Sequence, residues 1–135
     1  MKNNSFQFSK KSKLKKKNKV IGIVGTRRRD SYQDCLKVRT AFLQVYKPGD
    51  TICSGLCSKG ADYFAVVISR KFHTKTLWFP ADWEKHGKGA GMIRNTDIAK
   101  HSDILIACVS EDRTGGTEDT IQKYTDMGKP DLIIV

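Results

Sequence analysis

Short apolar runs alternate with longer segments of helical period along most of this 135-residue chain. The runs are rich in β-branched residues and apolar on both faces, as expected for strands buried in a parallel sheet. The segments between them repeat apolar positions at helical spacing, which is typical of helices that cover such a sheet. The pattern predicts strands at 20–24, 51–53, 76–79, 104–109 and 132–135, with helices at about 31–47, 61–73, 92–101 and 117–127.

This order of elements predicts an α/β fold, a doubly wound Rossmann-like parallel sheet of about five strands with helices on both faces. Asp30 or Ser31 is expected to cap the first helix, and a polar, Gly-rich connection is expected over 81–91. The expected strand order is 3-2-1-4-5, which places the topological switch point between the first and fourth strands. Ligands of such sheets bind outside the carboxyl ends of the strands.

The formal net charge of +11 is concentrated at the start of the chain. Residues 1–19 contain eight lysines and no acidic residue, whereas the remainder has 17 basic and 14 acidic residues. Residues 1–18 are therefore predicted to form a disordered basic tail, and 19–135 a single ligand-binding domain. A solvated extension is favoured for the tail, and an arm that binds nucleic acid or an acidic partner is the alternative.

Targeting and metal-binding patterns are not found in the sequence. No apolar region follows the lysines, and no stretch reaches the roughly 18 apolar residues of a membrane span. The four cysteines complete no zinc pattern. We therefore expect a soluble cytoplasmic protein without membrane contact, with free thiols, and with neither a bound metal nor a cofactor.

The loops expected at the carboxyl ends of the strands are rich in glycine, small hydroxyl residues or arginine. Such loops let the backbone approach a phosphate closely and present N–H groups at the start of a helix. One such loop is weak evidence for a phosphate-binding site, but four such loops at one edge of a sheet are stronger evidence. The candidate ligand-binding residues are Gly25, Thr26, Arg27, Ser54, Gly55, Gly60, Asp62, Gly91, Arg94, Asn95, Gly115, Gly116 and Thr117.

Several of these residues also have a purely structural interpretation. Gly25 could serve only a turn, with Arg27 solvated. For Asp62, stabilisation of a helix start through the dipole is favoured over acceptance of a hydrogen bond from a sugar hydroxyl. Trp83 could stack on a base or fill a hydrophobic gap. Arg94 is expected in the first turn of its helix, where a cation opposes the dipole, so a ligand role would explain it.

Two common nucleotide motifs are absent. The sequence has no G-x-x-x-x-G-K-[ST] pattern, which excludes a P-loop NTPase, and no G-x-G-x-x-G pattern after the first strand, which argues against a classical NAD dehydrogenase.

Taken together, the loops resemble those of the SLOG superfamily, which includes the DprA and LOG groups, and most closely its YpsA/YspA-related branch. The resemblance covers nearly all of 20–135. It implies a nucleotide-type ligand and a homodimer or higher homo-oligomer. The residues that carry it are Gly25-Thr26-Arg27, Ser54-Gly55, Gly60-Ala61-Asp62, Phe79-Pro80-Ala81-Asp82-Trp83, His86-Gly87-Lys88-Gly89-Ala90-Gly91, Arg94-Asn95 and Gly116-Thr117.

The LOG resemblance also implies an arginine and the glutamate of a GGxGTxxE motif as catalytic groups. Arg94 matches the arginine, but the glutamate position is occupied by Thr120. Glu118 and Asp119 lie nearby but would point off the helix in other directions than Thr120, since successive residues are about 100° apart. Glu118, Asp119 and Asp62 are the carboxylates that such an activity could use. Arg94 and Glu118 are the catalytic candidates. The leading hypothesis is nucleotide binding or sensing; the alternatives are a nucleoside-monophosphate N-glycosidase and a DprA-like nucleic-acid binder.

Overall fold

A five-stranded, entirely parallel sheet forms the centre of the molecule, with the order β3-β2-β1-β4-β5. This confirms the predicted α/β class and strand order. The computed structural model describes residues 18–135, so the prediction for the tail at 1–18 lies outside the described residues except at Asn18. The strands are β1 (Val20–Gly25), β2 (Thr51–Ser54), β3 (Lys75–Trp78), β4 (Ile104–Cys108) and β5 (Leu132–Ile134).

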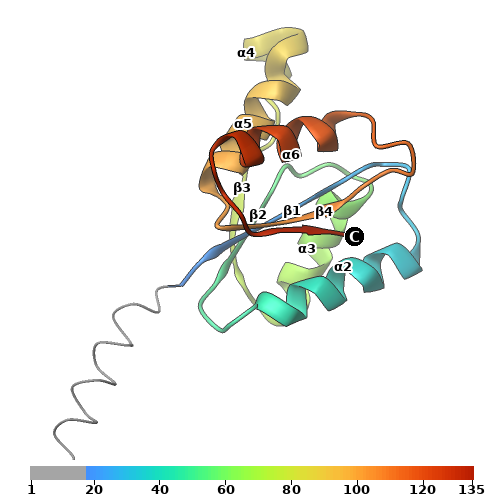
Figure 1. Cartoon of the computed structure of the whole chain (residues 1–135), viewed down its shortest axis with the longest axis vertical. Coiled ribbons are helices and arrows are strands. Elements are labelled where there is room, and N and C mark those ends of the chain that lie inside the picture. The colour runs from blue at the N-terminus through green and yellow to red at the C-terminus, as the bar shows by residue number, and fades with distance from the viewer. Residues whose placement is uncertain (1–17) are drawn as a thin grey trace, which may run out of the picture.

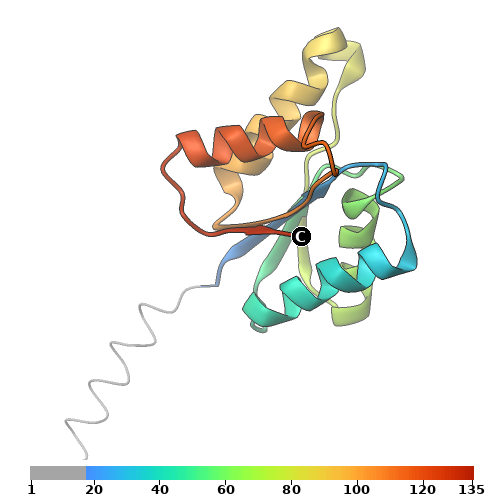
Figure 2. The same cartoon turned by 45° about the vertical axis from the view of Figure 1, so that its right-hand side comes forward.

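Helices cover both faces of the sheet, as Figures 1 and 2 show. Helices α2 and α3 pack on one face and α5 and α6 on the other, so each crossover returns the chain to the next parallel strand. Within 18–135, no helix has both the length and the apolar composition needed to cross a membrane. The helices are α2 (Tyr32–Val45), α3 (Ala61–Phe72), α4 (Trp83–His86), the 3-10 turn η1 (Gly87–Gly89), α5 (Ala90–His101) and α6 (Gly116–Asp126).

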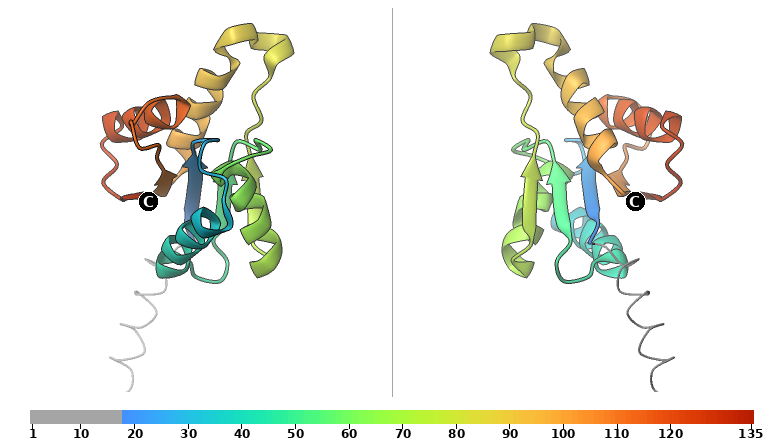
Figure 3. Two further views of the ribbon diagram at one scale, coloured as in Figure 1. Left: turned by 90° about the vertical axis from the view of Figure 1, so that its right-hand side faces the viewer. Right: turned by 90° about the vertical axis from the view of Figure 1, so that its left-hand side faces the viewer.

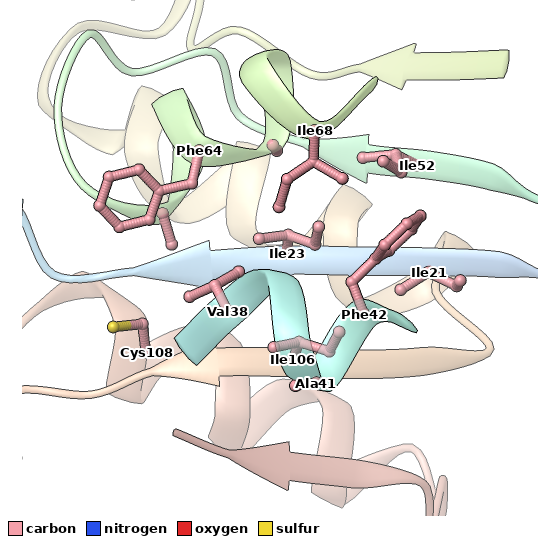
Figure 4. Close-up of a cluster of buried hydrophobic side chains, with 12 residues drawn as sticks. Ile21, Ile23, Val38, Ala41, Phe42, Ile52, Phe64, Ile68, Ile106 and Cys108 are labelled. Carbon is pink, nitrogen blue, oxygen red and sulfur yellow. The ribbon is translucent and has the colours of Figure 1, made fainter. Parts of the chain in front are cut away.

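Alternation along the strands divides the core into two clusters. Ile21 and Ile23 of β1 point towards α2 and α3, where they meet Phe42 and Ile68 (Figure 4). Val24 joins the cluster beneath α5 and α6 on the other face. Both faces of the central strands are thus buried, as their continuous apolar runs predict.

The segment predicted as a polar connection contains α4 and η1 instead. The Asp82 carboxylate accepts a hydrogen bond from the Lys85 N–H at 3.1 Å and caps α4. This segment and the first part of α5 project beyond the carboxyl ends of the strands (Figure 3). Because α5 begins at Ala90, Arg94 lies beyond its first turn. The expectation that Arg94 opposes the helix dipole in the first turn is therefore wrong.

The two candidate caps of α2 have different roles. Ser31 is the N-cap and forms a capping box with Asp34. Asp30 instead accepts a hydrogen bond from the Gly60 N–H at 2.8 Å, which links the loop after β1 to the loop after β2. The sequence left these alternatives open, and the structure assigns a separate function to each.

Gly25, the last residue of β1, is in close contact with both helix α3 and strand β4. A Cβ atom at this position would be 2.6 Å from the Ala61 Cβ and 2.8 Å from the Cys108 Cβ. We expect Gly25→Ala to lower the free energy of unfolding by about 1–3 kcal/mol through overpacking. Denaturant unfolding measures this loss. Gly89→Ala, where an added Cβ meets no atom within 4 Å, is the control and should leave stability nearly unchanged.

Candidate functional site

A cavity of about 380 Å³ opens at the carboxyl edge of the sheet, beside the switch point between β1 and β4. Its wall is built by the loops after β1, β2 and β4 and by the facing parts of α3, α5 and α6. This is the place that the doubly wound topology predicts for a ligand. The lining residues are Val24, Gly25, Thr26, Arg27, Arg28, Cys57, Asp62, Arg94, Asn95, Ile98, Thr114, Gly115, Gly116, Thr117 and Thr120.

The loops after β1 and β2 lie directly against each other on one side of the cavity. Gly60 has a φ of +72°, and a Cβ atom there would lie 2.5 Å from the Thr26 carbonyl oxygen. The hydrogen bond from the Gly60 N–H to Asp30 holds the same contact. Glycine at this position therefore brings the start of α3 up to the β1 loop and closes that side of the cavity.

Two helices begin at the cavity without a side-chain cap. Gly60 is the N-cap of α3 and Gly115 is the N-cap of α6, and neither can supply a side-chain oxygen to the first-turn N–H groups. Such N–H groups, with the helix dipole behind them, bind anions. Helix α2 contrasts with both, since its Ser31 cap already accepts a hydrogen bond from a first-turn N–H group, that of Asp34. The cavity is thus favourable for a negatively charged group.

Arg94 extends from α5 into the cavity and is held in a fixed orientation. Its Nε donates to the Asn95 Oδ1 at 3.0 Å, and its Nη1 donates to the Gly55 carbonyl oxygen at 3.1 Å. Within the described part of the chain, these bonds leave the two N–H groups of Nη2 without an acceptor. A preorganised guanidinium with free donors is well suited to bind phosphate or carboxylate.

Asp62 supplies a buried carboxylate to the same cavity. Only 6% of the residue is exposed, and its Oδ2 lies 3.9 Å from the Arg94 Nη1 and 3.4 Å from the Cys57 backbone nitrogen, which donates to it. Burial raises the pKa of the Asp62 carboxyl, and the Arg94 guanidinium opposes this effect without cancelling it. The charge on Asp62 therefore has a net cost in the folded protein.

We expect Asp62→Asn to raise the melting temperature at pH 7. The folded protein holds the Asp62 proton more tightly than the unfolded chain does, so the stability linked to this group is lost as the pH rises through the folded-state pKa. The gain in melting temperature from Asp62→Asn should shrink as the pH falls towards about 4, the ordinary aspartate pKa. Melting curves across this pH range test it, with Asp126→Asn at the exposed end of α6 as the control for the loss of one negative charge.

Arg27 and Arg28 place two further guanidinium groups at the cavity. Arg28 forms a two-pronged ion pair with Asp112, at 2.7 and 3.1 Å, and also donates to the Thr114 Oγ1 at 3.1 Å. The bond from Arg28 is the main reason why the pKa of Asp112 is well below its usual range. Arg27 is exposed, and its Nη2 lies 3.7 Å from the Cys57 Sγ.

Asn95 joins α5 to α6, the two neighbouring helices that both contribute residues to the cavity wall. Its Nδ2 donates to the Gly116 carbonyl oxygen at 3.2 Å and to the Asp119 Oδ2 at 3.1 Å. Lys123 pairs with the same Asp119 oxygen at 2.8 Å. Asn95 thereby fixes the start of α6 relative to Arg94, its neighbour on α5.

The structure places nine of the predicted ligand-binding residues on the wall of one cavity. They are Gly25, Thr26, Arg27, Asp62, Arg94, Asn95, Gly115, Gly116 and Thr117.

The other predicted site residues lie behind or beside the wall. Ser54 is buried and donates to the Ile23 carbonyl oxygen at 2.6 Å, joining β2 to β1. Gly55 accepts the bond from Arg94, and Gly60 holds the loop contact described above. Gly91 lies next to the Trp83 ring. Of the catalytic candidates, Arg94 lines the cavity, whereas Glu118 lies outside the wall and pairs with Arg113 at 2.7 and 3.0 Å.

Sequence reasoning did not select six of the lining residues. Thr120 is one helical turn after Gly116 and donates to its carbonyl oxygen at 3.3 Å, so helical spacing alone places both on one face. Arg28, Cys57 and Thr114 belong to the predicted loops, but nothing in their spacing distinguishes them from their neighbours. Val24 and Ile98 belong to apolar runs that predict only core positions.

The described residues contain no group of three or more His, Cys, Asp or Glu side chains placed to hold a metal ion. All four cysteines are free thiols, and Cys57 is the one that lines the cavity. The polar groups of the cavity are thus arginines, hydroxyls, backbone N–H groups, one amide, one thiol and one carboxylate.

Comparison with known proteins supports the fold. No family model matches the sequence, and no curated protein matches it. The solved structure of the molybdenum cofactor binding protein from the phototrophic bacterium Rippkaea orientalis is similar to this chain, with a TM-score of 0.63 and 16% sequence identity. The match covers 88% of this chain and 77% of that protein. At this identity, the similarity shows a shared fold.

Proposed function

We propose that this chain binds a phosphorylated small molecule of nucleotide type in the cavity at the carboxyl edge of the sheet. The observation that carries the proposal is the convergence of Arg27, Arg28 and Arg94 with two helix N-termini that have no side-chain cap. Guanidinium groups and first-turn N–H groups are the main phosphate-binding groups of proteins. The cavity volume of about 380 Å³ is within the range of small-molecule sites.

The charged groups suggest how such a ligand would be oriented. The phosphate would lie at the start of α6, where Gly116 and Thr117 line the cavity together with Arg94. Asp62 would then accept a hydrogen bond from a hydroxyl or amino group elsewhere on the ligand. This second contact explains why a carboxylate is retained in a basic cavity despite the cost of burying it. The SLOG resemblance of the loops supports a nucleotide as the ligand, and the homo-oligomer that it implies stays a prediction.

An N-glycosidase activity is less well supported by the positions of the carboxylates. Among the described residues that line the cavity, Asp62 supplies the one carboxylate, and Arg94 and the Cys57 N–H already engage it. Thr120 occupies the wall where the LOG resemblance requires a glutamate. Glu118 would have to leave Arg113 to reach a substrate. Binding therefore accounts for the geometry better than hydrolysis does.

A thermal-shift screen tests the proposal with the full chain against nucleoside mono-, di- and triphosphates and the corresponding unphosphorylated nucleosides. A ligand at a hundred times its dissociation constant stabilises the fold by about 2.7 kcal/mol, which is measurable for a domain of this size. The proposal requires a shift that depends on the phosphate. The isolated molybdenum cofactor is included because the structural neighbour binds it. A shift with that cofactor alone would mean that the cofactor, and not a nucleotide, is the ligand. The absence of a shift with every compound would contradict the proposal.

A further inference from the structure

A second groove, of about 650 Å³, adjoins the cavity through Arg28, whose side chain lines both. The groove lies between the loop after β1, the first turns of α2 and the loop after β4. None of its other lining residues takes part in the site described above. They are Arg29, Asp34, Lys37, Val109, Ser110, Glu111 and Arg113.

The boundary between the cavity and the groove is the ion pair of Arg28 with Asp112. Both side chains are largely exposed, at 59% and 56%. Exposed ion pairs contribute little net stability, because water competes for both partners. A ligand anion can therefore replace the Asp112 carboxylate on Arg28 without a large cost. The Asp112 side chain also accepts from Ser110 and Thr114, so it remains hydrogen-bonded after such an exchange.

The wall of the groove carries more basic than acidic side chains, but most of the basic ones are already paired. Four basic side chains and two acidic ones line it. Asp34 is already engaged by Arg29 at 3.0 Å and by its capping box with Ser31. Lys37 is exposed on α2, and within the described residues no carboxylate pairs with it. Arg28 and Arg113 are paired with the carboxylates of Asp112 and Glu118. Among the described residues that line the groove, Lys37 is therefore the one unpaired cation, and Arg28 and Arg113 can reach a second negative group only by exchanging their carboxylate partners.

We propose that the groove is a subsite for a second phosphate-bearing unit of the same ligand, so that the preferred ligand class is dinucleotide-like rather than mononucleotide. This inference rests on the proposed function. One unit would occupy the cavity, the linking or second phosphate would contact Arg28 in place of Asp112, and the second unit would lie along Lys37 and Arg113. Because Arg28 borders both spaces, one extended molecule can contact it from either side.

Calorimetric titration of the full chain tests the inference with matched probes. The nucleoside monophosphates AMP, GMP, CMP and UMP are compared with the 5′-phosphorylated dinucleotides pApA, pGpG, pCpC and pUpU. We expect the best dinucleotide to bind up to about fivefold more tightly than its mononucleotide, the gain of one exposed ion pair. This gain should shrink between about 50 and 500 mM salt, since exposed charges are screened.

Lys37→Glu is the decisive variant, because it reverses a charge in the groove and leaves the cavity wall unchanged. It should remove the dinucleotide preference and keep mononucleotide affinity. Lys71→Glu, the same change on the exposed surface of α3 outside both spaces, is the matched control and should keep the preference. Melting curves show whether both variants fold.

The two proposals fail in distinguishable ways. If mononucleotides bind but dinucleotides bind no better, or if the preference survives in Lys37→Glu, the groove is not a subsite and the proposed function stands. If neither probe class binds the wild-type chain, both proposals are overturned. Support requires a dinucleotide preference that Lys37→Glu abolishes and Lys71→Glu retains.

Discussion

Gly116→Asp should weaken binding of the phosphorylated ligand by about a hundredfold or more while the protein remains folded. The new carboxylate would stand at the start of α6, on the wall where the ligand phosphate is expected. Placing a carboxylate next to a bound phosphate costs several kcal/mol through repulsion of like charges. About 2.8 kcal/mol corresponds to a hundredfold change in affinity. Titration calorimetry with the best nucleotide from the screen measures the loss.

The fold should tolerate this change. A Cβ atom at Gly116 would have the Asn95 Nδ2 at 3.8 Å as its nearest neighbour, and an acidic residue in the first turn is favoured by the helix dipole. Gly89→Asp is the matched control, because Gly89 is also at a helix N-terminus, that of α5, but has nothing within 4 Å. Equal affinities for the two variants would show that the phosphate does not lie at the start of α6.

Arg94→Ala should lower the affinity for the same ligand by about ten- to a hundredfold. Hydrogen bonds to charged groups contribute about 1.5–3 kcal/mol each, and the Arg94 side chain lines the cavity. The substitution also removes the cation beside Asp62, so the melting temperature should fall. The binding loss and the stability loss have different causes and can be separated.

The double variant Arg94→Ala with Asp62→Asn makes that separation. Neutralising Asp62 removes the unpaired buried charge, so the double variant should regain much of the melting temperature that Arg94→Ala loses. Its affinity for the phosphorylated ligand should stay low, because the guanidinium is still absent. Recovery of binding together with stability would mean that Arg94 acts on the fold and not on the ligand.

Periodicity along the chain was sufficient to predict the sheet. The apolar runs such as 20–24 and 104–109 are apolar on both faces, which specifies buried parallel strands, and the connections fix their order. The same reasoning placed the glycine-rich loops at one edge, because all parallel strands end there. It failed at 83–89, since a four-residue helix such as α4 has too few positions to show a period.

The details of the site depend on contacts that no local pattern contains. Arg28 and Asp112 are 84 residues apart in sequence, and their pairing follows from the adjacency of β1 and β4. Whether Glu118 faces the cavity depends on its pairing with Arg113 and on the rotation of α6. The early start of α5 changed the helical position of Arg94 but left it in the cavity. Sequence thus predicts which loops meet, and packing decides which side chains face the ligand.

The measurement that tests the central claim most directly is a nuclear magnetic resonance titration of the isotope-labelled full chain with the nucleotide that gives the largest thermal shift. Saturable amide shifts should concentrate at 25–28, 57–62, 94–95 and 114–120, the segments that surround the cavity. Shifts confined to residues 1–17, or spread over surfaces away from these segments, would contradict a phosphate-binding cavity at the carboxyl edge of the sheet.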